Sequence, residues 1–299
     1  MKGSENARME EGNGYLKEAD KLWKPDWDNA CPLYEKAAVC FKNAKAYDRA
    51  KYAYKRAAET YHGMKLYGFQ LKRMKLIPSR SGGAAKSLEE AAKMATLEKS
   101  LTEAVELYKE ASSLQRENGA HDRAAEILIV AAKAIEETDD GGDIAIQLAK
   151  DAIDIYETED RFLYAGTAFK YAVSVSLMNK QIDEAISILE KQAESNIKLN
   201  RDPDLFKTHL SLIVIHLHRD DTVSANKVYQ EAIQNAGFDR SAEGQAAGAL
   251  IDAFESGDQK QVKAITSKQV FTFLDNQVAK LAIHMKASAV SKGGDDDLI

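Results

Sequence analysis

The chain has 299 residues, 44% apolar and 29% charged, which is enough for a large core in one or two domains and excludes a protein disordered by composition. Only four prolines interrupt it, and this scarcity favours helix almost everywhere. The net charge of −6 argues against a general nucleic-acid-binding protein, so any basic surface must be local.

The first residues, MKGSENARMEEGNGYL, contain no apolar segment, so we expect no signal peptide. The longest apolar stretches, ILIVAAKAI and LSLIVIHL, are too short to span a bilayer. If the protein works at a membrane, it is expected to be recruited there.

The segment DKLWKPDWDNA contains both tryptophans of the chain, Trp23 and Trp27, around a Lys–Pro turn. Pro25 is expected to end one helix, and Asp26 or Asp28 to cap the next. Indole rings favour the boundary between water and lipid, so tryptophans in such a loop can anchor it at a membrane. The alternative is that they close the first layer of the fold. We favour packing for Trp27, whereas both interpretations stay open for Trp23.

The two cysteines, Cys31 and Cys40, are nine residues apart in a helical pattern. Nine residues of helix separate them by about 13 Å, which is too far for a disulfide. We expect both to be small core residues of a reduced, intracellular protein.

A repeat of about forty residues organises most of the chain. Five segments share a polar turn, an alanine and then apolar residues at helical spacing, and the last four alanines are 41, 40 and 40 residues apart. Partner helices such as RAAEILIVAAKAIEE lie between these segments, and stacked helix pairs build one continuous core. The pattern predicts an all-α fold over residues 1–236, a right-handed tetratricopeptide-like α-solenoid of helical hairpins, with an unrelated helical bundle as the alternative. The repeat alanines are Ala50, Ala104, Ala145, Ala185 and Ala225.

One interval breaks the period, because Ala50 and Ala104 are 54 residues apart, about 14 too many. The surplus falls near residues 66–83, where lysines and arginines occur without any acidic residue. The segment LKRMKLI within it could bind anionic lipid or an acidic partner. We favour a tolerated surface insertion, since longer loops cost little free energy.

No P-loop, GxGxxG, HExxH or cysteine-rich metal spacing occurs, so we expect neither an enzyme nor a cofactor. The cluster HLHRDD places His216 and His218 two residues apart, but helical side chains at that spacing do not share a face. We interpret it as the polar end of a helix.

The pattern changes at Gly237. Residues 237–290 predict three or four short helices that cap the solenoid, with a turn at Gly257 and Asp258. Residues 291–299 predict a flexible acidic tail, which nevertheless ends in two aliphatic residues, Leu298 and Ile299.

Three stretches give the chain a family resemblance: LWKPDWDNACPLYEKAAVCFKNAKAYDRAKYAYKRAA, HLHRDD, and GFDRSAEGQAAGALIDAFESGDQKQV followed by FLDNQVAKLA. Over residues 15 to 285, apart from the insertion, it resembles the soluble NSF attachment proteins (SNAPs), most closely the gamma type. The resemblance implies a cytoplasmic, peripherally membrane-associated adaptor without enzymatic activity. Such an adaptor binds the syntaxin-containing four-helix SNARE complex and recruits the NSF hexamer, which disassembles the complex with ATP. The alternative is a general tetratricopeptide scaffold in chaperone or cargo trafficking, although the 34-residue period of chaperone-binding repeats is absent.

The resemblance also implies site residues. A SNARE bundle is acidic outside, so the first helices of successive pairs should offer lysines, although Glu126 and Thr167 stand where the alpha type has lysines. On the NSF side, acidic residues of the C-terminal helices and the penultimate Leu298 match, while Ser256 departs from the motif. The N-terminal loop of the family contacts lipid. The implied residues are Lys93, Lys133, Lys170 and Lys207 for SNAREs, Asp252, Glu255 and Leu298 for NSF, and Leu22 and Trp23 for the membrane.

Overall fold

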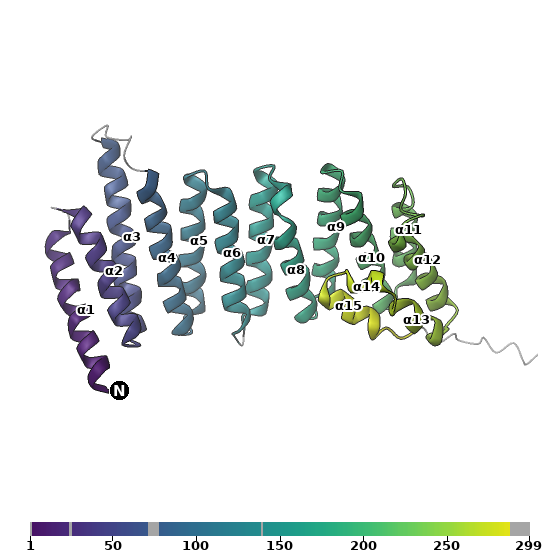
Figure 1. The fold of residues 1–299 in the computed structure, drawn as a ribbon, viewed down its shortest axis with the longest axis horizontal. Helices are drawn as coiled ribbons and strands as arrows, with labels where there is room; N and C mark the ends of the chain where they lie inside the picture. Colours follow the sequence, from purple (N-terminus) through teal and green to yellow (C-terminus); the bar gives the residue numbers. More distant parts are fainter. Residues whose placement is uncertain (1, 24–25, 71–77, 139, 288–299) are drawn as a thin grey trace, which may run out of the picture. The chain divides into compact units, whose positions relative to one another are not determined.

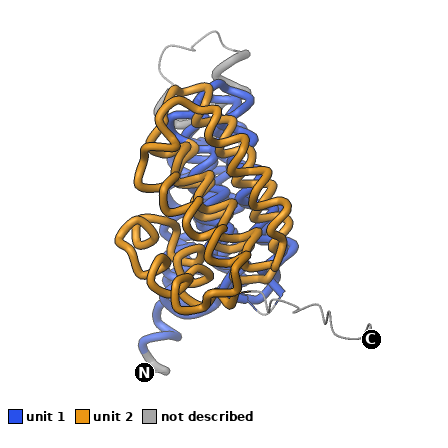
Figure 2. Tube along the Cα trace, turned by 90° about the vertical axis from the view of Figure 1, so that its right-hand side faces the viewer, with its two compact units in different colours: residues 1–164 blue, residues 165–299 orange. Residues whose placement is uncertain are grey.

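The computed structural model describes residues 2–23, 26–70, 78–138 and 140–287. The regular structure of these residues is helical throughout, without a strand. The chain divides into two compact units, Met1–Tyr164 and Ala165–Ile299 (Figure 2).

Unit 1 is a stack of antiparallel helices in which each helix packs against its neighbour in the sequence (Figure 1). Helices α4 and α6 also touch each other directly, as alternate helices do in a solenoid of hairpins. The elements are α1 (Lys2–Leu22), α2 (Trp27–Asn43), α3 (Tyr47–Gln70), α4 (Pro78–Leu97), α5 (Leu101–Glu117), α6 (His121–Glu136), α7 (Gly142–Thr158) and the 3₁₀ turn η2 (Phe162–Tyr164).

Unit 2 consists of two hairpins, followed by a group of shorter helices. Helix α12 packs against α10 and α11, and α15 turns back onto α8 and α10, as Figure 1 shows for the yellow helices near α10. The C-terminal helices therefore lie against the first helix of each hairpin in this unit. The elements are α8 (Gly166–Met178), α9 (Ile182–Lys198), α10 (Asp202–His218), α11 (Thr222–Ala232), α12 (Ala242–Glu255), α13 (Gln259–Thr266), α14 (Gln269–Thr272) and α15 (Asn276–Ile283).

The repeat alanines occupy one structural position. Each is the fourth residue of the second helix of its hairpin, and each is fully buried. A methyl group at this position lets the two helices of a hairpin approach closely, while a larger side chain would force them apart. The predicted solenoid with a period of about forty residues is therefore confirmed.

The turns between helices also repeat. In eight of them the residue after the helix cap is left-handed, with φ between 51° and 74°, and the next N–H bonds the carbonyl five residues earlier. In one such turn Gln181 N lies 2.9 Å from Ser176 O, and Lys180 has φ 60°. This is the Schellman arrangement, which satisfies the last carbonyls of the helix. Glycine supplies the conformation twice, at Gly119 and Gly257; the other six residues are Lys45, Lys99, Asp160, Lys180, Asn200 and Asp220.

Some of the extra residues near 66–83, which lengthen one interval of the repeat, are helical. Helix α3 has 24 residues and α4 has 20, against 17 in both α5 and α7, so the surplus lengthens the two helices that flank it (Figure 1). These two helices approach closely, since a Cβ on Gly83 would lie 2.6 Å from the Tyr61 ring. The segment LKRMKLI, residues 71–77, lies outside the described residues, and its binding role stays a prediction.

Candidate functional site

The end of α1 is held by an aromatic cluster. Leu22, Trp23 and Trp27 are half-buried and pack against a core that includes Cys31 and Tyr34. The Asp26 side chain caps α2 by accepting from Asn29 N at 3.3 Å, as the Lys–Pro turn predicted. The two cysteines form no disulfide, and Cys31 is buried as expected, whereas Cys40 is only half-buried.

Arg56 of α3 completes this cluster. Its guanidinium lies 4.1 Å from the centroid of the Trp23 ring, and it donates to the Tyr34 hydroxyl at 3.2 Å and to Glu59 at 2.7 Å. The Tyr34 hydroxyl donates to Asp20 at 2.7 Å, and burial together with this acceptor raises the Tyr34 pKa above its usual range. The implied membrane-contact residues thus lie together, on a support that includes an arginine 33 residues away in the sequence. Sequence reasoning missed Arg56 because only the fold brings it to the tryptophan.

The implied SNARE-binding lysines all lie on first helices of hairpins, α4, α6, α8 and α10. In unit 1, Lys93 is paired with Glu90 at 2.6 Å, and Lys42 of α2 reaches the same carboxylate at 3.1 Å. Lys133 is exposed on α6. The Glu90 carboxylate therefore pairs with two ammonium groups, those of Lys42 and Lys93.

In unit 2 the structure brings two of these lysines together. Lys170 and Lys207 line one groove of about 330 Å³, which Arg201 and the exposed Phe273 also line. Lys207 lies 4.0 Å from Asp204. The sequence could not predict this groove, because one wall comes from the turn between α14 and α15.

The implied NSF-contacting residues lie on α12. Asp252 and Glu255 are both exposed, and the Glu255 carboxylate accepts from Asn226 of α11 at 2.6 Å. The start of α12 is fixed by Ser241, which accepts from Gly244 N at 2.9 Å. A Cβ on Gly244 would lie 1.9 Å from the Phe238 carbonyl oxygen, so the close approach requires glycine here. Leu298 lies outside the described residues.

The cluster HLHRDD ends α10 and starts α11. His216 is buried and His218 is exposed, and burial lowers the pKa of the His216 imidazole. Arg219 pairs with Asp183, and Asp221 caps α11 by accepting from Ser224 N at 2.9 Å. Among the described residues no group of three or more His, Cys, Asp or Glu side chains could hold a metal ion. Each charged residue here has a structural partner, in agreement with a polar helix end.

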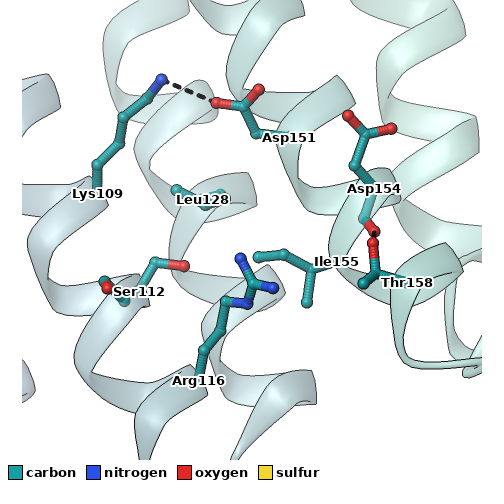
Figure 3. Close-up of a pocket in the computed structure, with 9 residues that line it drawn as sticks. Lys109, Ser112, Arg116, Leu128, Asp151, Asp154, Ile155 and Thr158 are labelled. Atoms are coloured by element: carbon teal, nitrogen blue, oxygen red, sulfur yellow. Dashed lines mark hydrogen bonds and ion pairs between the residues drawn. The ribbon is translucent and has the colours of Figure 1, made fainter.

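A second groove, of about 280 Å³, lies in unit 1 between α5 and α7 and was not predicted (Figure 3). Lys109 points across it to Asp151, at 2.8 Å, and Arg116 lies 3.8 Å from Glu159. The Ser112 hydroxyl donates to the Ala124 carbonyl at 3.0 Å. Since Lys109 and Asp151 already pair across the groove, and Arg116 pairs with Glu159 beside it, we assign the groove no ligand.

The family assignment rests on nearly the whole chain. The model of the family described as "Soluble NSF attachment protein, SNAP" matches residues 4–282, which include every helix of both units except the first two residues of α1 and the last residue of α15. The chain belongs to the soluble NSF attachment protein family.

Two curated relatives place it within the SNAP family. It is 38% identical to the gamma-soluble NSF attachment protein of Dictyostelium discoideum, over 93% of this chain and 83% of the relative. It is 28% identical to the protein of the same name in Arabidopsis thaliana, over 95% of each chain. Among SNAPs it is thus most similar to the gamma type, as its sequence motifs predicted.

Members of this family are adaptors without enzymatic activity. In the part of the chain that the structure describes, no helix is both long enough and apolar enough to cross a membrane.

Proposed function

We propose that this SNAP-type adaptor binds assembled SNARE complexes and recruits the ATPase NSF, which then disassembles them in vesicle fusion and intracellular transport. The observation that carries the proposal is the family match over residues 4–282. Its working place would be the cytoplasmic surface of membranes, where the adaptor is bound peripherally.

The SNARE contact is assigned to the lysines of the first helices. The outer surface of a SNARE bundle is acidic, and a local positive field attracts it even though the whole chain carries a net charge of −6. Lys93, Lys133, Lys170 and Lys207 each supply one exposed or half-exposed ammonium group. Each such contact is weak in water, and several adaptors acting on one complex gain affinity through avidity.

The NSF contact is assigned to α12 and the acidic tail. Asp252 and Glu255 are three residues apart, so their carboxylates share one face of the helix. This face would meet a basic domain of NSF. Leu298 behind Asp295, Asp296 and Asp297 would offer an apolar side chain on an acidic tether.

The membrane contact is assigned to the loop after α1, where Leu22 and Trp23 are half-buried rather than enclosed. A partly covered indole can still reach the lipid boundary with its outer edge.

One experiment separates the two protein contacts. The double variant Asp252→Asn with Glu255→Gln should bind a preformed SNARE complex as the wild type does, while recruiting NSF to it less well in a co-sedimentation assay. The matched control neutralises Asp183, an exposed acidic residue of α9, and should affect neither step. Undiminished NSF recruitment by the double variant would remove α12 from the NSF contact. A wild-type chain that does not bind the SNARE complex would refute the proposed function itself.

A further inference from the structure

Buried, hydrogen-bonded side chains form the bottom of the groove in unit 2. Asn196 of α9 donates to the Thr208 hydroxyl of α10 at 3.2 Å, and both side chains are buried. The Thr208 hydroxyl in turn donates to the Asp204 carbonyl at 2.8 Å. Because these polar groups are satisfied among themselves, the floor is rigid, and the groove keeps its shape without a ligand.

Some of the charged side chains that line the groove already have partners among the described residues, and one does not. The Asp275 side chain caps α15 by accepting from Gln277 N at 2.9 Å, and Asp204 is paired with Arg201 at 2.9 Å. Lys170 is exposed on α8 and forms no ion pair with any residue that the structure describes. Both carboxylates thus have partners already, while the Lys170 ammonium group remains available to an acidic ligand.

Phe273 supplies an apolar surface beside these cations. It is 60% exposed in the turn between α14 and α15, whereas the next residue, Leu274, is buried. Exposed apolar side chains are common singly, but this one borders a groove with three cations, Lys170, Arg201 and Lys207. Aromatic and arginine side chains together are typical of the residues that dominate protein–protein affinity.

We propose that this groove binds one turn of an acidic helix of the partner. A carboxylate of that helix would lie against Lys170 and Lys207, and an apolar side chain three or four residues away would pack on Phe273. Residues at this spacing share a helix face, which fits a groove with cations on one side and an aromatic ring on the other. The inference rests on the proposed function, in which the partner is a four-helix bundle. It adds that the C-terminal helices contribute an apolar anchor to the same site.

The test compares two exposed apolar residues of unit 2. Binding of the full chain to a preformed SNARE four-helix bundle should weaken by about tenfold or more in Phe273→Ala, since an anchor of this kind dominates an interface. Ile283→Ala is the control, because Ile283 is 58% exposed on α15 and does not line the groove. Its affinity should stay within about twofold of the wild type, as expected outside a hot spot. Phe273→Leu should retain most of the affinity, and unchanged melting temperatures would show that the variants fold.

A charge reversal tests the other half of the groove. Lys170→Glu should weaken binding more strongly at low salt than at high salt, because the contact is electrostatic. Lys227→Glu, on the exposed face of α11, is its control and should leave binding unchanged.

The outcomes separate this inference from the proposed function. If the wild type binds the bundle and Phe273→Ala binds it equally well, the inference is overturned and the proposed function stands. If the wild type does not bind at all, both fail. If Phe273→Ala loses binding to vesicles containing phosphatidylserine but keeps its affinity for the bundle, the groove is a lipid site, and the inference is equally overturned.

Discussion

A buried carboxylate in unit 1 depends on a single arginine. Glu89 of α4 is 6% exposed, and Arg123 of α6 donates to its two oxygens at 2.8 and 3.0 Å. Tyr108 lies close enough that burial first and then the Glu89 charge raise the Tyr108 pKa to about 12. Removing the arginine would therefore leave a negative charge in a site that water reaches poorly.

The expected cost follows from this burial. Breaking a fully buried ion pair by removing one partner costs about 3–5 kcal/mol. The Arg123 side chain is 46% exposed, so solvent already screens its end of the pair, and we reduce the expected loss in Arg123→Met to about 2 kcal/mol. For a chain of this size the melting temperature should fall by about 5 °C.

A matched control isolates the effect of the buried partner. Arg116 is also 46% exposed, but it lies 3.8 Å from the less buried Glu159, so Arg116→Met should cost less than about 1 kcal/mol. Adding Glu89→Gln to Arg123→Met should recover part of the stability, since it removes the stranded charge. Urea unfolding of the wild type, the two arginine variants and the double variant measures the free energy of unfolding of each protein. Equal losses in the two arginine variants, or no recovery in the double variant, would refute the reasoning.

Three further predictions concern other parts of the fold. Arg56→Gln should shift tryptophan emission to longer wavelength and cost about 1 kcal/mol, because the stacked guanidinium on Trp23 is lost; unchanged emission would contradict this packing. Lys180→Gly should raise the free energy of unfolding by about 0.5 kcal/mol, since φ 60° strains a lysine but not glycine, and a lower melting temperature would show that no strain is relieved. Burial lowers the pKa of His209 and His216 below 6.5, so the stability present above pH 6.5 should be lost as the pH falls through the folded-state values. Urea midpoints at pH 7.5 and 5.5 measure that loss, which should shrink in His209→Gln; identical midpoints would be inconsistent with neutral buried imidazoles.

The stacked helical hairpins could be predicted because the residues that define them are close together in the sequence. The alanines from Ala104 to Ala225 recur at a nearly constant interval, and the turn residues that fix this interval lie beside them in the sequence. The cap at Asp26 was predictable for the same reason, since it depends on neighbouring residues. Periodicity alone was therefore enough to predict the stacked hairpins.

The contacts that shape the surfaces could not be predicted, because they join residues far apart in the chain. Glu89 and Arg123 are 34 residues apart, and Phe273 borders the same groove as Lys170. Such pairs depend on how hairpins stack and on where α15 returns, which no local pattern encodes. The resemblance to the SNAP family indicated individual lysines, but it did not show that Lys170 and Lys207 line one groove.

The surplus near residues 66–83 could be predicted only in part. The broken period gave its length, but the sequence did not show that part of it extends α3 and α4. Because Gly83 packs against Tyr61, a deletion that includes Gly83 would disturb the packing of α3 against α4.

The central claim is that this chain couples SNARE complexes to NSF. The most direct measurement is the rate at which NSF and ATP take apart a preformed, fluorescently labelled SNARE complex with and without the purified chain. Our account predicts disassembly above the NSF-only rate, less of it with Asp252→Asn and Glu255→Gln combined, and less with Leu298→Ala although SNARE binding is intact. A rate equal to that of NSF alone, with no binding of the SNARE complex, would contradict it.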